Sequence, residues 1–171
     1  MINKNHFPQK ILLGFLTTFL SLSYKNSGFC EDMIKITNRK NQHQYVLTPE
    51  MSWQDAQNLA KKMGGNLVTI NDEKENQWLV DTFVKSDTNF LWIGLNDQEN
   101  EGEFIWVSGE KSDYYNWAKD EPNDNPKQGG EDYGVLNGFA NPFNRPVGTW
   151  SDAPIHVKLK AIVEITLPIL P

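Results

Sequence analysis

The hydrophobic pattern predicts two helices in the first half of the chain. Apolar residues recur at helical spacing over residues 53–63 and again over residues 79–84. Ser52 and Asp72 stand before these segments as N-caps, each with an acidic residue three positions later, as in a capping box. The pair at 64–65, both glycines, is typical of a helix C-terminus. We therefore predict a first helix that starts after Ser52 and stops at the glycines, and a second that starts after Asp72.

From residue 90 onward the pattern changes to short apolar runs separated by polar loops. Together with a hairpin over 34–47 and a short strand at 67–70, the predicted strands are 90–95, 104–107, 133–136, 149–150 and 161–165. Helices come first and strands later, which favours an α+β fold over an alternating parallel sheet. The loops 108–131 and 137–148 are long enough to indicate a functional role.

The first 30 residues have the pattern of a signal peptide. Basic residues precede an apolar run at 11–22, which has the length of a signal core and is too short to span a bilayer. Cleavage after Ser23 and cleavage within 28–30 both remain open, and Phe29 argues against a lipidated Cys30. We predict a signal peptide over 1–30, one domain over 31–171, no membrane span, and a secreted, extracellular or periplasmic location.

The charge balance makes the predicted domain acidic. The chain of 171 residues has 22 acidic and 16 basic residues, for a net charge of −6. Residues 1–30 hold three lysines and no acid, so 13 basic and 22 acidic residues remain, or −9. An acidic surface repels phosphate, which disfavours nucleic acids and anionic membranes as partners. One cysteine excludes an internal disulfide, and with only three histidines a zinc site is not expected.

The acidic residues of the second half gather in four loop segments. These segments lie at 97–103, 120–124, 131–132 and 152, and within 118–144 the bases are only Lys119 and Lys127. If the loops converge, the carboxylates repel one another unless a cation lies between them. Calcium fits because it accepts six to eight oxygen ligands in irregular geometry. A solvated acidic surface is the alternative, and an EF-hand is excluded because Ser108 holds its twelfth position.

A series of short motifs, in this order, resembles the C-type lectin-like domain. They are Tyr45-Val46-Leu47, Ser52-Trp53 with Ala56, residues 64–70, Glu75-Asn76, residues 92–95, Trp117, Glu121-Pro122-Asn123, Glu131-Asp132-Tyr133 and Trp150-Ser151-Asp152. The resemblance implies an α+β domain with two helices flanking antiparallel sheets and a long loop that carries calcium and ligand. It also implies a cis peptide bond before Pro122.

The resemblance further implies two calcium sites. The principal site, which also binds sugar, would use Glu121, Asn123, Glu131 and Asp152, with Ser151 at the remaining ligand position. The second, structural site would use Asp97, Glu101, Asp124 and Asp132. The Glu-Pro-Asn triplet is similar to the version that prefers mannose or glucose-type sugars over galactose. Two departures are the missing cysteine pairs and Ser151, which stands where sugar binders usually have asparagine and so has no amide to offer.

Three function classes follow. We expect a secreted, calcium-dependent module that binds glycans or glycoproteins. The alternative keeps the fold and the calcium but binds a protein and no sugar, and Ser151 favours it. An enzyme, such as a glycosidase with two catalytic carboxylates, is not expected because the acids lie on loops and none is placed in an apolar pocket.

We assign Trp92, Trp106, Trp117 and Trp150 to the core. The loop at 137–147 either reshapes the ligand surface or is tucked over the core by its two phenylalanines.

Overall fold

The computed structural model describes residues 33–166, so the predicted signal peptide lies outside the described residues. The helices are α1 (Trp53–Lys62), α2 (Glu73–Phe83) and the 3-10 turn η1 (Pro126–Gln128). The strands are β1 (Ile36–Thr37), β2 (Gln44–Leu47), β3 (Asn66–Leu67), β4 (Phe90–Asn96), β5 (Ile105–Trp106), β6 (Tyr133–Asn137), β7 (Trp150–Ala153) and β8 (Lys160–Ile165). None of the helices between residues 33 and 166 is long and apolar enough to cross a membrane.

The strands form one mixed sheet with the order β1-β2-β8-β4-β6-β7, with β3 beside β8 and β5 beside β4. Every pairing between these strands is antiparallel except that of β4 with β8, where Leu91 lies opposite Lys160. The sequence resemblance implied antiparallel sheets, and the pairing of β4 with β8 is the one parallel exception among the described strands. The physical reason is that β8 is the last strand and inserts between β2 and β4, where it joins the two antiparallel halves.

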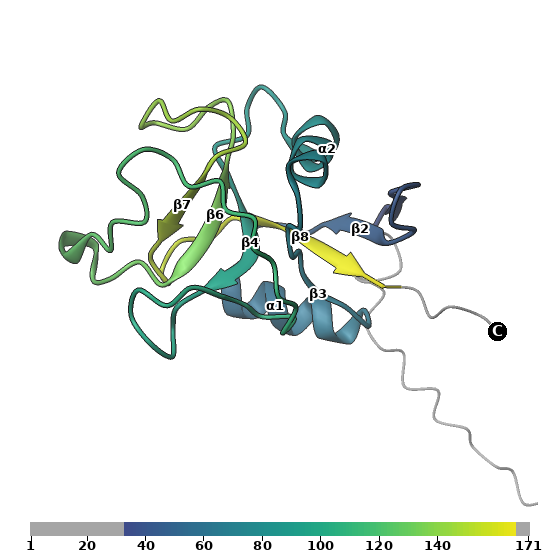
Figure 1. Cartoon of the computed structure of the whole chain (residues 1–171), viewed down its shortest axis with the longest axis horizontal. Coiled ribbons are helices and arrows are strands. Elements are labelled where there is room, and N and C mark those ends of the chain that lie inside the picture. The colour runs from purple at the N-terminus through teal and green to yellow at the C-terminus, as the bar shows by residue number, and fades with distance from the viewer. Residues whose placement is uncertain (1–32, 167–171) are drawn as a thin grey trace, which may run out of the picture.

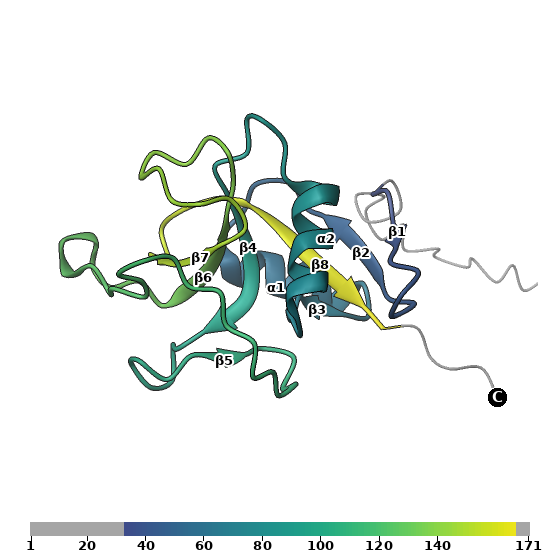
Figure 2. The same ribbon diagram turned by 45° about the horizontal axis from the view of Figure 1, so that its top comes forward.

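The two helices cover opposite faces of the sheet, as Figures 1 and 2 show. Both start as predicted: Ser52 Oγ accepts a hydrogen bond from the Asp55 amide, and the Asp72 carboxylate accepts one from the Glu75 amide. The cap fixes where each helix begins, and the apolar stripe fixes which face it buries. One core cluster contains the buried apolar residues of α1 and the other contains those of α2.

The aromatic core agrees with the sequence prediction. Trp92, Trp106 and Trp150 are buried, and the half-buried Trp117 packs edge-on against Trp150. With one cysteine in the chain, this packing takes the place that disulfides fill in small secreted domains.

Two strands differ from their predicted bounds in ways that matter for function. The predicted strand at 67–70 keeps regular pairing only at Asn66–Leu67, because the Val68 carbonyl bonds Gly94 and the Thr69 amide bonds the Glu164 side chain. The predicted strand at 149–150 instead runs from Trp150 to Ala153. The ladder between β6 and β7 continues past the tryptophan, and therefore Ser151 and Asp152 lie on a strand.

Candidate functional site

Asp152 of β7 anchors the loop that carries the Glu121-Pro122-Asn123 triplet. Its buried carboxylate accepts hydrogen bonds from the amide of Asn123 at 3.0 and 3.1 Å and from that of Asp124 at 2.7 Å. The peptide bond between Glu121 and Pro122 is cis, as the resemblance implies. A strand residue thereby holds the loop by its backbone, which leaves the loop side chains available for other contacts.

Glu121 has one satisfied and one unsatisfied carboxylate oxygen. Its Oε1 accepts a hydrogen bond from Asn123 Nδ2 and is ion-paired with Arg145, whereas its buried Oε2 has no hydrogen-bond partner among the described residues. Burial raises the pKa of Glu121 to about 7; the neighbouring Asp152 adds to this rise and Arg145 opposes it. An acid in such a setting needs a proton or a metal ion at its free oxygen.

Glu131 closes the same loop from the other side. Its Oε2 accepts a hydrogen bond from the Asn125 amide at 3.1 Å, and its own amide donates to Asp124 Oδ1 at 3.0 Å. Burial raises the pKa of Glu131, and the nearby Asp152 carboxylate adds to the rise. The short turn η1 spans the intervening residues, so the loop from 121 to 131 is tied at both ends to acidic side chains.

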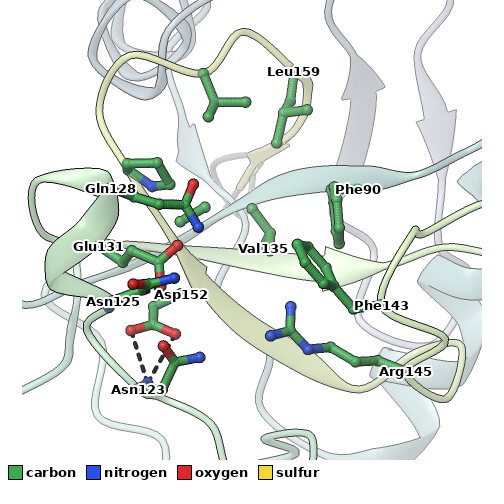
Figure 3. Close-up of a pocket in the computed structure, with 13 residues that line it drawn as sticks. Phe90, Asn123, Asn125, Gln128, Glu131, Val135, Phe143, Arg145, Asp152 and Leu159 are labelled. Atoms are coloured by element: carbon green, nitrogen blue, oxygen red, sulfur yellow. Dashed lines mark hydrogen bonds between the residues drawn. The ribbon is translucent and has the colours of Figure 1, made fainter.

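Three of the four residues predicted for the principal site line one cavity of about 130 Å³, and Glu121 does not line it. Asn123, Glu131 and Asp152 line one end, as Figure 3 shows, together with Asn125 and Gln128, and Arg145 lines the cavity as well. The other lining side chains are apolar. Ser151 is different: it is fully buried, it does not line the cavity, and its hydroxyl is hydrogen-bonded to the Asn137 side chain.

A second acidic cluster lies beside the first. Asp97, Glu101 and Asp132 each offer a carboxylate oxygen, and these oxygens lie within 4.8 Å of one another. The Asp97 Oδ2 accepts a hydrogen bond from the Gly102 amide at 2.8 Å, but its Oδ1 is buried without a partner in the described part of the chain. Burial raises the pKa of Asp97, and the charge of Asp132 raises it further.

Asp124 lies between the two clusters and is not a member of the second one. A Cβ added at Gly130 would lie 3.5 Å from Asp124 Oδ1 and 3.7 Å from Asp132 Oδ1, so both carboxylates flank the same glycine. Asp124 Oδ1 already accepts the Glu131 amide. The structure thus groups three of the four residues predicted for the second site and leaves the fourth at its border.

Both sets of residues offer oxygen ligands that suit calcium, but among the described residues only those of Asp97, Glu101 and Asp132 converge within 4.8 Å of one another. Each contains a buried carboxylate oxygen without a hydrogen-bond donor, Asp97 Oδ1 in one and Glu121 Oε2 in the other. The remaining groups are carboxylates and an amide, with no histidine or cysteine in either set. Hard, irregular oxygen sites of this kind fit Ca²⁺ better than Zn²⁺ or Mg²⁺.

Sequence reasoning did not anticipate two side-chain pairs in this region. Arg145 neutralises Glu121, and the only advance signal was a single arginine in an otherwise uncharged loop. Asn137 donates a hydrogen bond to the Ser151 hydroxyl, and no feature of the sequence indicated this contact. The loop at 137–147 is not tucked over the core by its phenylalanines, because Phe139 is 63% and Phe143 58% exposed.

The comparisons with known proteins agree on one family. The sequence model of the family described as Lectin C-type domain matches residues 49–162. A perlucin-like protein of Mytilus galloprovincialis is 33% identical over 119 residues, which cover 66% of this chain and 76% of that protein. Lectin BRA-3 of Megabalanus rosa is 35% identical over 110 residues, which cover 63% of this chain and 61% of that lectin.

Solved structures give the same answer. The mouse scavenger receptor C-type lectin carbohydrate-recognition domain has a TM-score of 0.64 and 28% identity, covering 81% of this chain and 97% of that one. The carbohydrate-recognition domain of cow CD23 has a TM-score of 0.66 and 28% identity, covering 79% and 95%. The predicted α+β fold is therefore confirmed, and these relatives are lectins rather than enzymes.

Proposed function

Because the chain belongs to the C-type lectin domain family, we propose that it is a secreted, calcium-dependent lectin that binds glycans or glycoproteins. The observation that carries the proposal is the pair of buried carboxylate oxygens without donors, one in each acidic cluster. Burying an ionised oxygen without a partner is costly, and a bound cation removes that cost. The cow CD23 domain, whose structure was obtained in the presence of a GlcNAc2Man3 oligosaccharide, supports the ligand class.

The principal calcium ion would be held by Glu121, Asn123, Glu131 and Asp152. A second ion would be held by Asp97, Glu101 and Asp132, with Asp124 at the border of that cluster. At the principal site the metal supplies coordination to two neighbouring sugar hydroxyls. Glu121 would accept a hydrogen bond from one hydroxyl and Asn123 would donate one to the other. This polarity is the basis for a preference for mannose or glucose-type sugars over galactose.

The experiment is a calorimetric titration with calcium, followed by competition with free sugars. Wild-type protein should bind calcium, and mannose should displace a bound mannose-type glycan while galactose should not. Asp152→Asn should lose calcium and sugar binding, because a neutral amide replaces the carboxylate at the centre of the site. Asp113→Asn, at an exposed acid away from both clusters, is the matched control. Absence of any calcium binding up to millimolar concentration would contradict the proposal, and elution by galactose would contradict the sugar preference.

A second candidate function is a lectin-like module that binds calcium and a protein but no sugar. The position of Ser151 favours it: Asn137 engages the hydroxyl, and Ser151 does not reach the cavity. Ser151→Asn separates the two functions. In a sugar-binding site that lacks one ligand, the added amide should raise calcium and sugar affinity about tenfold. Calcium binding without any sugar binding, in both the wild type and this variant, would favour the protein-binding module.

A further inference from the structure

The cavity at the principal site has two chemically different ends. The polar end is formed by Asn123, Asn125, Gln128, Glu131 and Asp152. The apolar end is formed by Phe90, Val135, Phe143, Pro154, Val157 and Leu159. In Figure 3 these polar side chains lie on one side and the two phenylalanines on the other, with Val135 between them, and Arg145 lies next to Phe143. A ligand that contacts both ends therefore needs a polar part and an apolar part.

The apolar end combines two strand residues with four loop residues. Phe90 begins β4 and Val135 is the central residue of β6, while Pro154 and Leu159 belong to the connection between β7 and β8. Val135 and Pro154 are buried, and Phe90 and Leu159 are half-buried. The central sheet fixes Phe90 and Val135, and Pro154 is buried, so this part of the apolar end exists before any ligand arrives, which lowers the cost of binding.

Phe143 and Arg145 form the mouth of the cavity. The Phe143 ring is 58% exposed and its centroid lies 6.2 Å from that of Phe90. The Arg145 guanidinium carbon lies 4.5 Å from the centroid of the Phe143 ring, and the same guanidinium is ion-paired with Glu121. Arg145 is thus already neutralised, so the apolar end presents no free charge to attract a charged group. An exposed aromatic ring at the edge of an apolar cavity favours an uncharged apolar occupant.

The size of the cavity limits the occupant further. The whole cavity, with its polar end included, has a volume of about 130 Å³, close to that of the roughly 150 Å³ apolar cavities known to admit one benzene molecule. It has room for one ring and for no sugar beside it, so the sugar has to lie outside the cavity on the calcium ion. From this geometry we propose that the ligand is a glycoside whose aglycone is a single aryl ring, bound at the apolar end while the sugar binds the calcium ion. The inference rests on the proposed function for its sugar half, and the aryl half is carried by the cavity alone.

The test compares methyl and phenyl α-mannoside by calorimetry on the calcium-loaded protein. The phenyl glycoside should bind roughly tenfold more tightly, because its ring leaves water for the apolar end. Phe143→Ala should remove most of that gain and leave the affinity for methyl mannoside unchanged. Phe139→Ala is the matched control, since Phe139 lies on the same loop, is equally exposed and does not line the cavity. Val157→Phe, which fills the apolar end, should abolish the gain.

The outcomes separate this inference from the proposed function. If methyl mannoside binds in calcium and the phenyl ring adds nothing, the inference is wrong and the lectin function stands. If the gain persists in both Phe143→Ala and Val157→Phe, the ring binds elsewhere and the inference is again wrong. If neither glycoside binds in calcium, the proposed mannose-type lectin function itself fails.

Discussion

Two regions of this molecule bury acidic side chains, and they satisfy them in opposite ways. In the first, which we name the tyrosine network, Tyr45, Glu75 and Glu164 meet between β2, α2 and β8. The Tyr45 hydroxyl lies 2.6 Å from Glu75 Oε1 and 2.9 Å from Glu164 Oε1. The other oxygens of the two carboxylates accept backbone amides, and His43 lies 2.6 Å from Glu164. Every carboxylate oxygen in this network therefore has a protein partner.

The two acidic loop clusters differ in this respect. Asp97 Oδ1 and Glu121 Oε2 are buried without a donor among residues 33–166, and a second carboxylate lies near each, Asp132 near Asp97 and Asp152 near Glu121. Acidic side chains that are similarly buried therefore have different partners in the two regions. The tyrosine network is complete within the chain. In the loops Arg145 neutralises Glu121, but Glu121 Oε2 and Asp97 Oδ1 still lack a donor that a cation from solution could replace. The contrast assigns a structural role to the first set of acids and a binding role to the second.

The largest expected difference between the two regions is the effect of calcium on the free energy of unfolding. At a hundredfold excess over its dissociation constant, one bound ion adds about 2.7 kcal/mol to the free energy of unfolding. Urea denaturation with calcium and with chelator measures this difference. We expect the calcium effect in the wild type and in a Tyr45→Phe variant, and its reduction in Asp152→Asn. Equal stability of the wild type in calcium and chelator would contradict the contrast.

Removing the hydroxyl of the tyrosine network should cost about 1–3 kcal/mol. Tyr45→Phe removes a hydroxyl whose single hydrogen is donated to one of the two buried carboxylates at a time, and no ion from solution is expected to replace it. Asn41 still contacts Glu75 and His43 still contacts Glu164. The loss should be the same in calcium and in chelator. Tyr115→Phe, at a tyrosine that is 55% exposed, serves as the control and should change nothing. A loss that disappears in calcium would mean that the two regions are coupled.

The fold was predictable where it depends on local signals. The N-caps Ser52 and Asp72, the apolar stripes behind them and the runs that became β4 and β6 are all short-range patterns, and each formed the expected element. The parallel pairing of β4 with β8 was not predictable, because it joins segments about seventy residues apart in sequence and no local pattern encodes it.

For the candidate site, the sequence indicated the acidic residues but not the side chains that contact them. The acids could be identified because they cluster in the sequence and match a family motif. Their partners could not be identified, because the Arg145 contact with Glu121 and the Asn137 contact with Ser151 depend on how a long loop and two neighbouring strands pack. The cavity next to the site combines side chains from four separate parts of the chain, which no motif links.

The stability of the calcium-free protein should fall by about 1–2 kcal/mol as the pH rises from 4.5 to 7, with water screening part of the effect. Burial raises the pKa of Glu121 to about 7 and also raises that of Glu131 and Asp97. The folded state therefore binds more protons than the unfolded state in this window, and its stability is lost as the pH rises through it.

Calcium should remove this slope, because the metal binds the deprotonated carboxylates. Burial also raises the pKa of Glu75, but that group contributes equally in calcium and in chelator, so the difference between the two conditions isolates the loop acids. Denaturation midpoints at several pH values, with and without calcium, give the measurement. Parallel pH profiles in the two conditions would show that the loop acids do not bind the metal.

The smallest expected effect is that of Asp97→Asn, which should raise the free energy of unfolding in chelator and lower it in calcium. In chelator, Asp97→Asn should stabilise the protein by about 0.5–1.5 kcal/mol, because the amide can donate to Asp132 or Glu101 while its oxygen still accepts the Gly102 amide. In calcium the variant should lose the part of the stabilisation that the second ion contributes. Glu99→Gln, at an exposed acid in the same loop, removes one charge without touching the cluster and should change neither value by more than a few tenths of a kcal/mol. If Asp97→Asn destabilises the protein equally in both conditions, Asp97 is a structural acid like those of the tyrosine network, and the second calcium site does not exist.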